Sequence, residues 1–490
     1  MEISVNRKDI KFLPDASRVI ARFLYTDDER AIYTIRSVLN MSDIEASIAL
    51  KRVLRDYSVR HRNISKVFEK HFNKISHLFT PLNIDPETLD FSKKLLIGSY
   101  FTMEYSIESS AFFNPSIVEH PDQSETGQGE KRVIISFRAT GEGHISSIVF
   151  RRGVLDNDHN LSIEPVGNML EEAEHIRRHI YDKETFKSKL DEMKDFQGII
   201  PSGLILDKLN DKFTYGELRN CIEEDRKTLH LAASKKMFLN QIMWLASSHY
   251  EIEFSLDTNI SERVIFPVST NENNGIEDAR FVKFTDDNNE ANYYATYTAF
   301  DGTTILPKLL DTRDFYHFRV LPLHGEVAQN KGMALFPRKV NGKYAMLCRM
   351  DGVNNYIAYS DNITVWREAK LLQQPKFPWE FIQIGNCGSP IETKAGWLVI
   401  THGVGPMREY VLGASLFDIH HPEKEIGRLK NPLLIPNAKE REGYVPNVVY
   451  SCGSMVHNEH LIIPYAMSDY ASTYATINLK ELLKELKNSR

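Results

Sequence analysis

The feature that most constrains this chain is a recurring pair of short β-rich runs joined by a tight turn. Four such pairs begin near residues 279, 334, 389 and 447, so the spacings are 55, 55 and 58 residues. The second pair carries Asn341-Gly342 between its runs, a dipeptide typical of hairpins because both central residues must accept positive φ. A repeat of this length predicts four-stranded β-units packed side by side.

A fifth pair lies upstream of the other four. Asn114-Pro-Ser-Ile-Val is followed by a long polar turn and then by the apolar run from Arg132 to Arg138. Five units predict an all-β fold, a five-bladed β-propeller. An open β-sandwich with accidental spacing is the alternative.

Two stretches have helical periodicity instead. In residues 28–78 apolar side chains recur at spacings of three and four, and a second helical stretch covers about 168–250, with helices expected at 169–181, 183–196 and 228–249. We therefore expect an N-terminal helical region at 1–90 and a propeller domain at 91–490, interrupted by the insertion. The two regions should pack together beside the propeller through their apolar stripes, and there either narrow its entrance or form a homo-oligomer interface.

Composition excludes several classes of protein. The net charge is −6 and no basic domain stands out, so no nucleic-acid partner is expected. The four cysteines are too scattered for a disulfide framework or a zinc site, and no metal is expected. Met1 to Lys11 has no apolar core and no run approaches the roughly 20 residues of a membrane span. We expect a cytoplasmic protein without a membrane partner.

The second run of every pair ends in a polar or charged residue. In a propeller, equivalent strand ends gather at one mouth of the central channel, so these residues should converge on one pocket. Acid, base and cation in one concave site favour sugar or phosphate chemistry. The residues are Arg138, Thr298 with Asp301, Arg349, His402 and Asp469.

The segment from Gly275 to Arg280 places two acids, Glu277 and Asp278, side by side at the start of a run. It is either a surface turn with a salt bridge or part of the pocket. Inside the pocket, partial desolvation would allow one carboxyl to stay protonated and serve as an acid.

These residues resemble glycoside hydrolase family 130, the β-mannoside phosphorylases and β-1,2-mannosidases. Similar motifs occur in the family's order over about residues 264–486, with a weaker match at 114–155. The motifs are Gly275-Ile-Glu-Asp-Ala-Arg-Phe-Val, Tyr297-Thr-Ala-Phe-Asp-Gly, Lys331-Gly-Met-Ala-Leu-Phe-Pro-Arg-Lys-Val-Asn-Gly-Lys-Tyr, Gly396-Trp-Leu-Val-Ile-Thr-His-Gly-Val and Glu442-Gly-Tyr-Val-Pro-Asn-Val-Val-Tyr. The helical regions depart from the shorter family members.

The resemblance implies a five-bladed propeller and an inverting phosphorolysis of β-linked mannosides, in particular β-1,2-manno-oligosaccharides. Asp278 would be the catalytic acid, acting through a mannose hydroxyl on the glycosidic oxygen, while phosphate attacks the anomeric carbon and gives α-mannose 1-phosphate. No cofactor is implied beyond phosphate as co-substrate. The implied phosphate-binding residues are Lys331, Arg349 and His402. Four further residues, Arg138, Arg280, Asp301 and Asp469, would orient the sugar.

Two alternatives remain open at this point. The first is a β-1,2-mannosidase of the same fold, with a carboxylate such as Glu326 activating water. The second is a non-catalytic sugar-binding propeller. Basic residues stand at all three implied phosphate-binding positions, Lys331, Arg349 and His402. This favours phosphorolysis, because phosphate needs cations and water does not.

Overall fold

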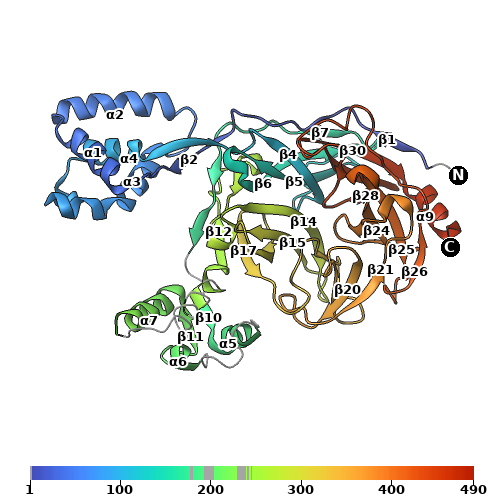
Figure 1. The fold of residues 1–490 in the computed structure, drawn as a ribbon. Helices are drawn as coiled ribbons and strands as arrows, with labels where there is room; N and C mark the ends of the chain where they lie inside the picture. The colour runs from blue at the N-terminus through green and yellow to red at the C-terminus, as the bar shows by residue number, and fades with distance from the viewer. Residues whose placement is uncertain are drawn as a thin grey trace.

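Five β-sheets of four or more strands follow one another along the chain in the computed structural model (Figure 1). The structure describes residues 3–176, 180–192, 203–228, 239, 242, 243 and 245–489. The sheets are mainly antiparallel, and consecutive strands pair as neighbours in most of them. The last two-thirds of the chain are therefore predominantly β.

The sheets are numbered here in chain order. Sheet 1 contains β4 (Ala111–Glu119), β5 (Lys131–Thr140), β6 (Ser146–Leu155), β7 (Leu161–Ile163), β8 (Glu171–Glu172) and β13 (Arg263–Ile265). Sheet 2 contains β14 (Gly275–Thr285), β15 (Ala291–Phe300), β16 (Ile305–Thr312), β17 (His317–Pro322), β12 (Tyr250–Glu253) and β9 (Glu174–Ile176). Sheet 3 contains β18 (Ala334–Leu335), β19 (Tyr344–Cys348), β20 (Asn355–Ser360) and β21 (Ala369–Gln373).

The last two sheets have the same plan. Sheet 4 contains β22 (Gln383–Asn386), β23 (Ile391–Thr393), β24 (Gly396–Val404), β25 (Tyr410–Phe417) and β26 (Glu425–Arg428). Sheet 5 contains β27 (Val449–Tyr450), β28 (Met455–His457), β29 (His460–Met467), β30 (Ala471–Asn478) and β1 (Val5–Arg7). The C-terminal helix α9 (Leu479–Asn488) packs on β25 and β26.

Each sheet packs against the next one through its first strand. β14 contacts β4, β18 contacts β15, β22 contacts β20, and β27 contacts β25. β4 also contacts β29, so the fifth sheet touches the first. The contacts between sheets therefore form a ring.

The five predicted hairpins are confirmed. β4 with β5, β14 with β15, β18 with β19, β23 with β24, and β28 with β29 are antiparallel pairs. Between β18 and β19, Asn341 has φ of 52° and Gly342 has φ of 80°. The Asn-Gly turn therefore has the backbone conformation that its sequence predicts.

The N-terminal region is not helical throughout. β1 pairs with β30, with Val5 opposite Ile477, and β2 (Val19–Phe23) pairs with β3 (Thr102–Ser106). The helices lie between β2 and β3 and extend ten residues past the expected boundary at 90. They are α1 (Asp28–Leu39), α2 (Asp43–Tyr57), α3 (Ile64–Lys74) and α4 (Phe91–Tyr100).

The inserted segment contains both helices and strands. The predicted helix at 169–181 is wrong, because this stretch forms β8, β9 and β10 (Ile180–Asp182), and β8 and β9 extend the edges of sheets 1 and 2. Pairing with the sheet edges thus determines the conformation of this stretch, although its apolar residues have the spacing of a helix. The prediction at 183–196 is confirmed for α5 (Lys183–Glu192), and α6 (Gly203–Leu206), β11 (Lys212–Thr214) and α7 (Tyr215–Thr228) follow. Most of the prediction at 228–249 lies outside the described residues.

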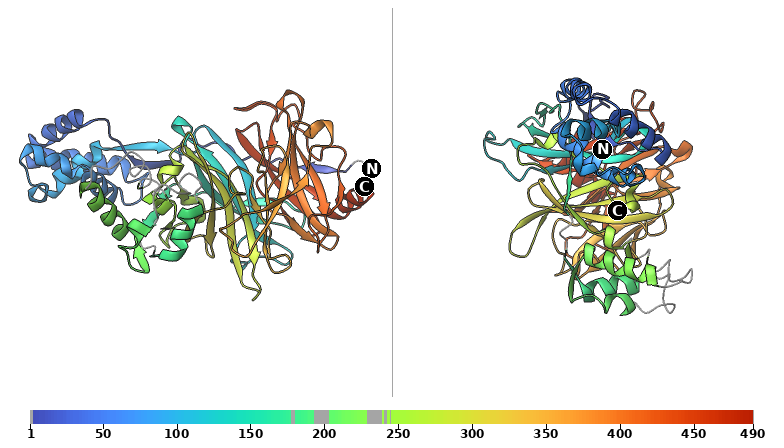
Figure 2. Two further views of the ribbon diagram at one scale, coloured as in Figure 1. Left: turned by 60° about the horizontal axis from the view of Figure 1, so that its bottom comes forward. Right: turned by 90° about the vertical axis from the view of Figure 1, so that its left-hand side faces the viewer.

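The two helical regions lie at the same end of the molecule, away from the chain termini (Figures 1 and 2). Each buries its apolar stripe in a core of its own, one around Ile35 and Phe72 and the other around Phe213 and Leu218. The prediction that the stripes pack against each other is therefore not met among the described residues.

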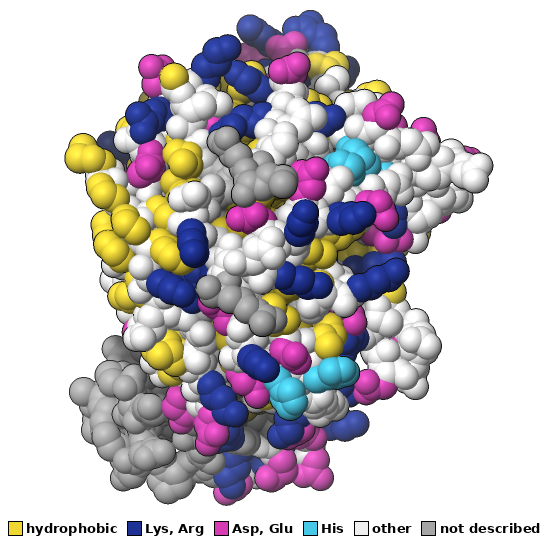
Figure 3. Space-filling model, turned by 90° about the vertical axis from the view of Figure 1, so that its right-hand side faces the viewer, with side chains coloured by type: hydrophobic (Ala, Val, Ile, Leu, Met, Phe, Trp, Pro, Cys, Tyr) yellow, Lys and Arg dark blue, Asp and Glu magenta, His cyan; other side chains and the backbone are white. Residues whose placement is uncertain are grey.

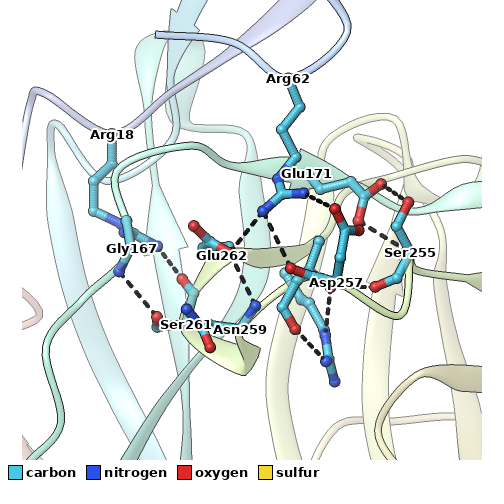
Figure 4. A network of polar contacts seen from close by, with 11 residues as sticks. Arg18, Arg62, Gly167, Glu171, Ser255, Asp257, Asn259, Ser261 and Glu262 are labelled. Atoms are coloured by element: carbon cyan, nitrogen blue, oxygen red, sulfur yellow. Dashed lines mark hydrogen bonds and ion pairs between the residues drawn. The ribbon is translucent and has the colours of Figure 1, made fainter. Parts of the chain in front are cut away.

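Arginines join the N-terminal region to sheet 1 and to the segment before β13. Figure 4 shows the contacts of Arg18 with Gly167 and Ser261 and those of Arg62 with Asp257 and Glu262. Arg18 donates from Nε to Glu108 at 2.7 Å and from Nη1 to the Gly167 carbonyl at 2.8 Å. Arg151 of β6 donates to the other oxygen of Glu108 at 2.8 Å. At the surface of the same junction, Arg62 pairs with Asp257 at 2.8 Å. One buried carboxylate thus accepts hydrogen bonds from two buried guanidinium groups.

We predict that Glu108→Ala destabilises the protein by about 3–5 kcal/mol, because the variant leaves Arg18 and Arg151 buried without their anion. Chemical denaturation followed by tryptophan fluorescence measures the loss. Arg313→Ala is the control, since Arg313 forms an exposed pair with Glu290 and should cost less than about 1 kcal/mol. Equal shifts in the two variants would contradict the prediction.

On the face of the molecule shown in Figure 3, basic and acidic side chains are interspersed and no continuous basic band crosses it. Among the described residues, no helix has the length and apolar character to cross a membrane.

Candidate active site

Two β-bulges aim polar side chains at one point between sheets 1 and 2. The pairing of β4 with β5 shifts register between Phe113 and Ser116, and that of β14 with β15 shifts between Glu277 and Arg280. Inside these shifts, Asn114 has φ of 50° and Asp278 has φ of 55°, a conformation that is uncommon outside glycine. Asn114 Nδ2 donates to Asp278 Oδ1 at 2.6 Å. The bulges thus bring an amide and a carboxylate from distant segments into contact.

Three cations surround the two acids of β14. Arg138, in β5, donates from Nη2 to Glu277 Oε1 at 2.9 Å, and its Nη1 lies 3.6 Å from Asp278 Oδ1. Lys331 donates to the other oxygen of Glu277. Arg280 donates to the Asp278 carbonyl at 3.2 Å and to the Tyr450 hydroxyl at 2.7 Å. Glu277 therefore links Arg138 to Lys331 across sheets.

The charges around Asp278 set its protonation. Burial alone would raise the pKa of this carboxyl, but Arg138 and Arg280, the Asn114 hydrogen bond and Lys331 together lower it below the usual value. Asp278 is therefore ionised at neutral pH while these cations have no other anion beside them.

Arg349 and His402 lie on the other side of this cluster, in sheets 3 and 4. Arg349 Nη1 approaches His402 Nε2 at 3.3 Å, and His402 Nδ1 lies 3.1 Å from the Asn386 carbonyl oxygen. The His402 ring is 5.0 Å from the Tyr450 ring, which links this pair to Arg280. Added bulk at Gly385 would clash, because a Cβ there would lie 2.5 Å from His402 Cε1.

His402 is buried, and its surroundings disfavour the charged form of the ring. Burial lowers its pKa well below the ordinary value, and Arg349 and Arg280 act in the same direction. A neutral ring that donates from Nδ1 to Asn386 presents an unprotonated Nε2 to Arg349. The expected roles of Lys331, Arg349 and His402 in binding phosphate stay predictions, and His402 lies within reach of Arg349.

Several guanidinium N–H groups at this site donate no hydrogen bond within the described part of the chain. Among the described residues, the Nε atoms of Arg138, Arg280 and Arg349 are buried without a hydrogen-bond partner. The four cations Arg138, Arg280, Lys331 and Arg349 outnumber the carboxylates of Glu277 and Asp278. Buried donors without acceptors are costly, so the site is suited to an anion that would accept from them.

Asp469 joins the cluster from the hairpin turn between β29 and β30. Ser468 and Asp469 both have φ of 50°, as a type I′ turn requires. Burial raises the pKa of Asp469 to about 6, and the negative charge of Asp278 also raises it. Asp469 therefore keeps its proton up to a higher pH than Asp278 does.

Asp301 and Glu326 are not part of this cluster. Asp301 accepts hydrogen bonds from the Thr303 and Thr304 amides at 2.9 and 2.7 Å and so closes its own turn after β15. Its expected role with the sugar stays a prediction that none of these contacts supports. Glu326, the carboxylate considered for activating water, is exposed in the segment after β17.

The sequence analysis missed three contributors, Asn114, Glu277 as a bridge, and Tyr450. Asn114 stands immediately before Pro115, inside the first recognised run, and that position could have drawn attention to it. Nothing in the local sequence indicates that Tyr450 receives Arg280. Among the described residues, no group of three or more histidines, cysteines or acids is arranged to hold a metal ion.

A repeated β-sheet protein with carboxylates and cations gathered at strand ends has the composition of a carbohydrate-processing or phosphate-processing enzyme. A family model described as beta-1,4-mannooligosaccharide phosphorylase matches residues 232–488. The chain belongs to this family, glycoside hydrolase family 130, and is an enzyme of the glycoside phosphorylase or hydrolase type.

Individual relatives have related descriptions. The 1,2-beta-oligomannan phosphorylase of Thermoanaerobacter sp. (strain X514) is 36% identical over 228 residues, which are 44% of this chain and 74% of the relative. The beta-1,2-mannobiose phosphorylase of Listeria innocua is 29% identical over 243 residues, 48% of this chain and 65% of the relative. A solved structure of a Listeria innocua beta-1,2-mannobiose phosphorylase with beta-1,2-mannobiose has a TM-score of 0.47 and 20% identity, covering 79% of this chain and 94% of that one.

We predict that His402 remains neutral between pH 6 and 8, because its charged form would be desolvated beside two arginines. Nitrogen-15 NMR of labelled histidine side chains reads the protonation directly, and the spectrum of His402→Gln identifies the signal. An imidazolium signal that titrates near pH 6.5 would contradict the arrangement.

Proposed function

We propose that the protein catalyses inverting phosphorolysis of β-linked mannosides, with β-1,2-manno-oligosaccharides as substrates, and releases α-mannose 1-phosphate. The observation that supports this most is the excess of cations beside Asp278, including three buried guanidinium groups whose Nε atoms have no partner among the described residues. A phosphate dianion needs its charge balanced and its oxygens hydrogen-bonded. Water needs neither, so a hydrolase would gain nothing from this arrangement.

We also propose an architecture for the arrangement of the five sheets. We take the five sheets as the five blades of a β-propeller, with the ring of sheet contacts as support. The catalytic residues then lie at one mouth of the central channel, because they come from strand ends of all five sheets. The helical N-terminal region and the insertion are additions to this catalytic domain.

We assign the following roles on the support of this geometry. Lys331 and Arg349 bind phosphate, and His402 positions Arg349 through its Nε2. Arg138, Arg280 and Asp469 orient the mannose unit beside Asp278. No cofactor is needed beyond phosphate, and we place the reaction in the cytoplasm, where phosphate is abundant and a phosphorylated product is retained. Exposed apolar residues on α2, Ile44 and Ile48, are available for a homo-oligomer contact.

Asp278 must hold a proton when the glycosidic bond breaks, although it is ionised in the free protein. Phosphate bound beside Lys331 and Arg349 would offset the cations that lower its pKa, and so favour protonation. Asp278 then passes the proton through a mannose hydroxyl to the glycosidic oxygen. A phosphate oxygen forms the new bond to the anomeric carbon on the opposite face. The bond to the leaving sugar breaks, and its electron pair stays on the oxygen that receives the proton.

We predict that β-1,2-mannobiose is cleaved only when phosphate is present, giving mannose 1-phosphate and mannose in equal amounts. Anion-exchange chromatography of products with and without phosphate measures both. Asp278→Asn cannot donate a proton and should lose about 10²- to 10⁴-fold in rate. Mannose released equally fast without phosphate, and no mannose 1-phosphate, would reject phosphorolysis and favour the mannosidase.

The same assay also tests whether Arg349 binds phosphate. Arg349→Ala should raise the apparent KM for phosphate far more than that for mannobiose, since only phosphate loses a bidentate partner. Arg313→Ala, at an exposed position, should change neither. Equal effects of Arg349→Ala on both substrates would remove Arg349 from the phosphate site.

We predict that the apparent KM for phosphate rises between pH 5 and 8 partly through Asp469. Its pKa of about 6 means that it is neutral below this pH and anionic above it, and an added anion beside Asp278 repels phosphate. Asp469→Asn keeps the side chain neutral at every pH, so its KM should vary less across this range. The same pH dependence in both proteins would contradict this role.

A further inference from the structure

Four loops contact or act on one another around the turn that carries Asp469. They are the turn after β5 that ends at His144, the turn after β24 with Met407 and Arg408, the segment 440–447 before β27, and the Ser468–Asp469 turn after β29. The Ser468–Asp469 turn adjoins the cluster, because the Phe112 amide of β4 donates to the Tyr470 carbonyl at 2.8 Å and β29 packs against β4. Asp278 and Arg408 both act on the charge of Asp469.

The side chains that these loops expose are large and apolar. Tyr444 is 66% exposed and Met407 is 88% exposed. The Tyr444 ring lies against the His144 ring from sheet 1, with centroids 5.2 Å apart and planes 31° from each other. Two rings from distant segments thus form a single aromatic surface open to solvent.

The segment that carries Tyr444 is held firmly. The Val445 amide donates to the Ser468 carbonyl at 3.0 Å, and Ser468 Oγ donates to the Glu440 carbonyl at 2.7 Å. Glu440 is buried and accepts from the Tyr465 hydroxyl at 2.7 Å. A Cβ at Gly443 would lie 2.4 Å from the Ser468 carbonyl oxygen, so only glycine permits this approach. The position of Tyr444 is therefore coupled to the turn that carries Asp469.

The position of this surface suits the part of the substrate that leaves the site. The mannose unit that is transferred must reach Asp278 and the buried cations, so it occupies the deepest position. The remaining units must then extend outward past the Asp469 turn. Aromatic faces stack against the C–H faces of pyranose rings and give orientation with little loss of side-chain entropy.

We propose that Tyr444 and His144 form a stacking surface for sugar units beyond the cleavage site, so that the preferred substrates are β-mannosides of three or more units. The inference rests on the proposed function for its choice of sugar. It assigns chain-length preference to two residues that take no part in phosphate binding or proton transfer.

The test compares kcat/KM for β-1,2-mannotriose and β-1,2-mannobiose in wild-type protein and variants. Tyr444→Ala should lower the ratio of trisaccharide to disaccharide roughly fivefold, because it removes the stacking face. Tyr444→Phe keeps the face and should preserve the ratio, and His144→Ala should lower it in part. Tyr33→Ala, at an exposed position on α1, should leave both substrates unchanged.

An unchanged ratio in Tyr444→Ala, or equal losses on both substrates, would overturn the proposal. The ratio does not depend on whether phosphate or water is the acceptor. If the enzyme proves to be a hydrolase, the phosphate assay fails while this comparison still gives its result, so the two failures are distinguishable.

Discussion

Packing between sheets is the constraint on which the rest of this structure depends. Each sheet uses its first strand to contact its neighbour, and β4 closes the series against β29. A sheet of four strands cannot bury both faces alone, so each needs two neighbours to complete its apolar core. The same contacts bring residues 114, 278, 349, 402 and 469 into one region although the chain separates them widely. The position of the site is thus a direct result of how the sheets are stabilised.

Electrostatics then determines what this region can do. Glu277 and Asp278 neutralise part of the charge of Arg138, Arg280 and Lys331, and the neutral His402 holds Arg349 without adding to it. The remaining positive charge is available to a substrate anion. The left-handed backbone at Asn114 and Asp278 is unfavourable in itself, and the hydrogen bond between their side chains and the packing of the bulges offset that cost. Part of the strained backbone of the molecule thus lies at the point where the chemistry is proposed.

The parts of the structure that could be predicted are those whose conformation depends on residues adjacent in the sequence. Asn341-Gly342 indicates its turn because two residues suffice to define it. The stretch 169–181 has helical spacing, yet its strands are formed by pairing with β13 and β12, which lie far along the chain. Asp301 stands at the end of its strand, as Arg138 does near the end of another. The carboxylate of Asp301, however, accepts hydrogen bonds from the Thr303 and Thr304 amides. The charge of His402 depends on burial among three sheets, which spacing does not indicate. Family resemblance supplied the role of Asp278, and geometry supplied its contact with Asn114.

The pairing of β1 with β30 has a consequence for how the chain is made. Val5 lies opposite Ile477, so β1 is synthesised early and stays unpaired until β30 has been made. Contacts between such distant segments form slowly, because a very long loop must close first. The unpaired β1 segment is open to pairing with other chains during this interval. Synthesis rate and chaperone supply should therefore affect the yield of folded enzyme more than the local stability of any one sheet.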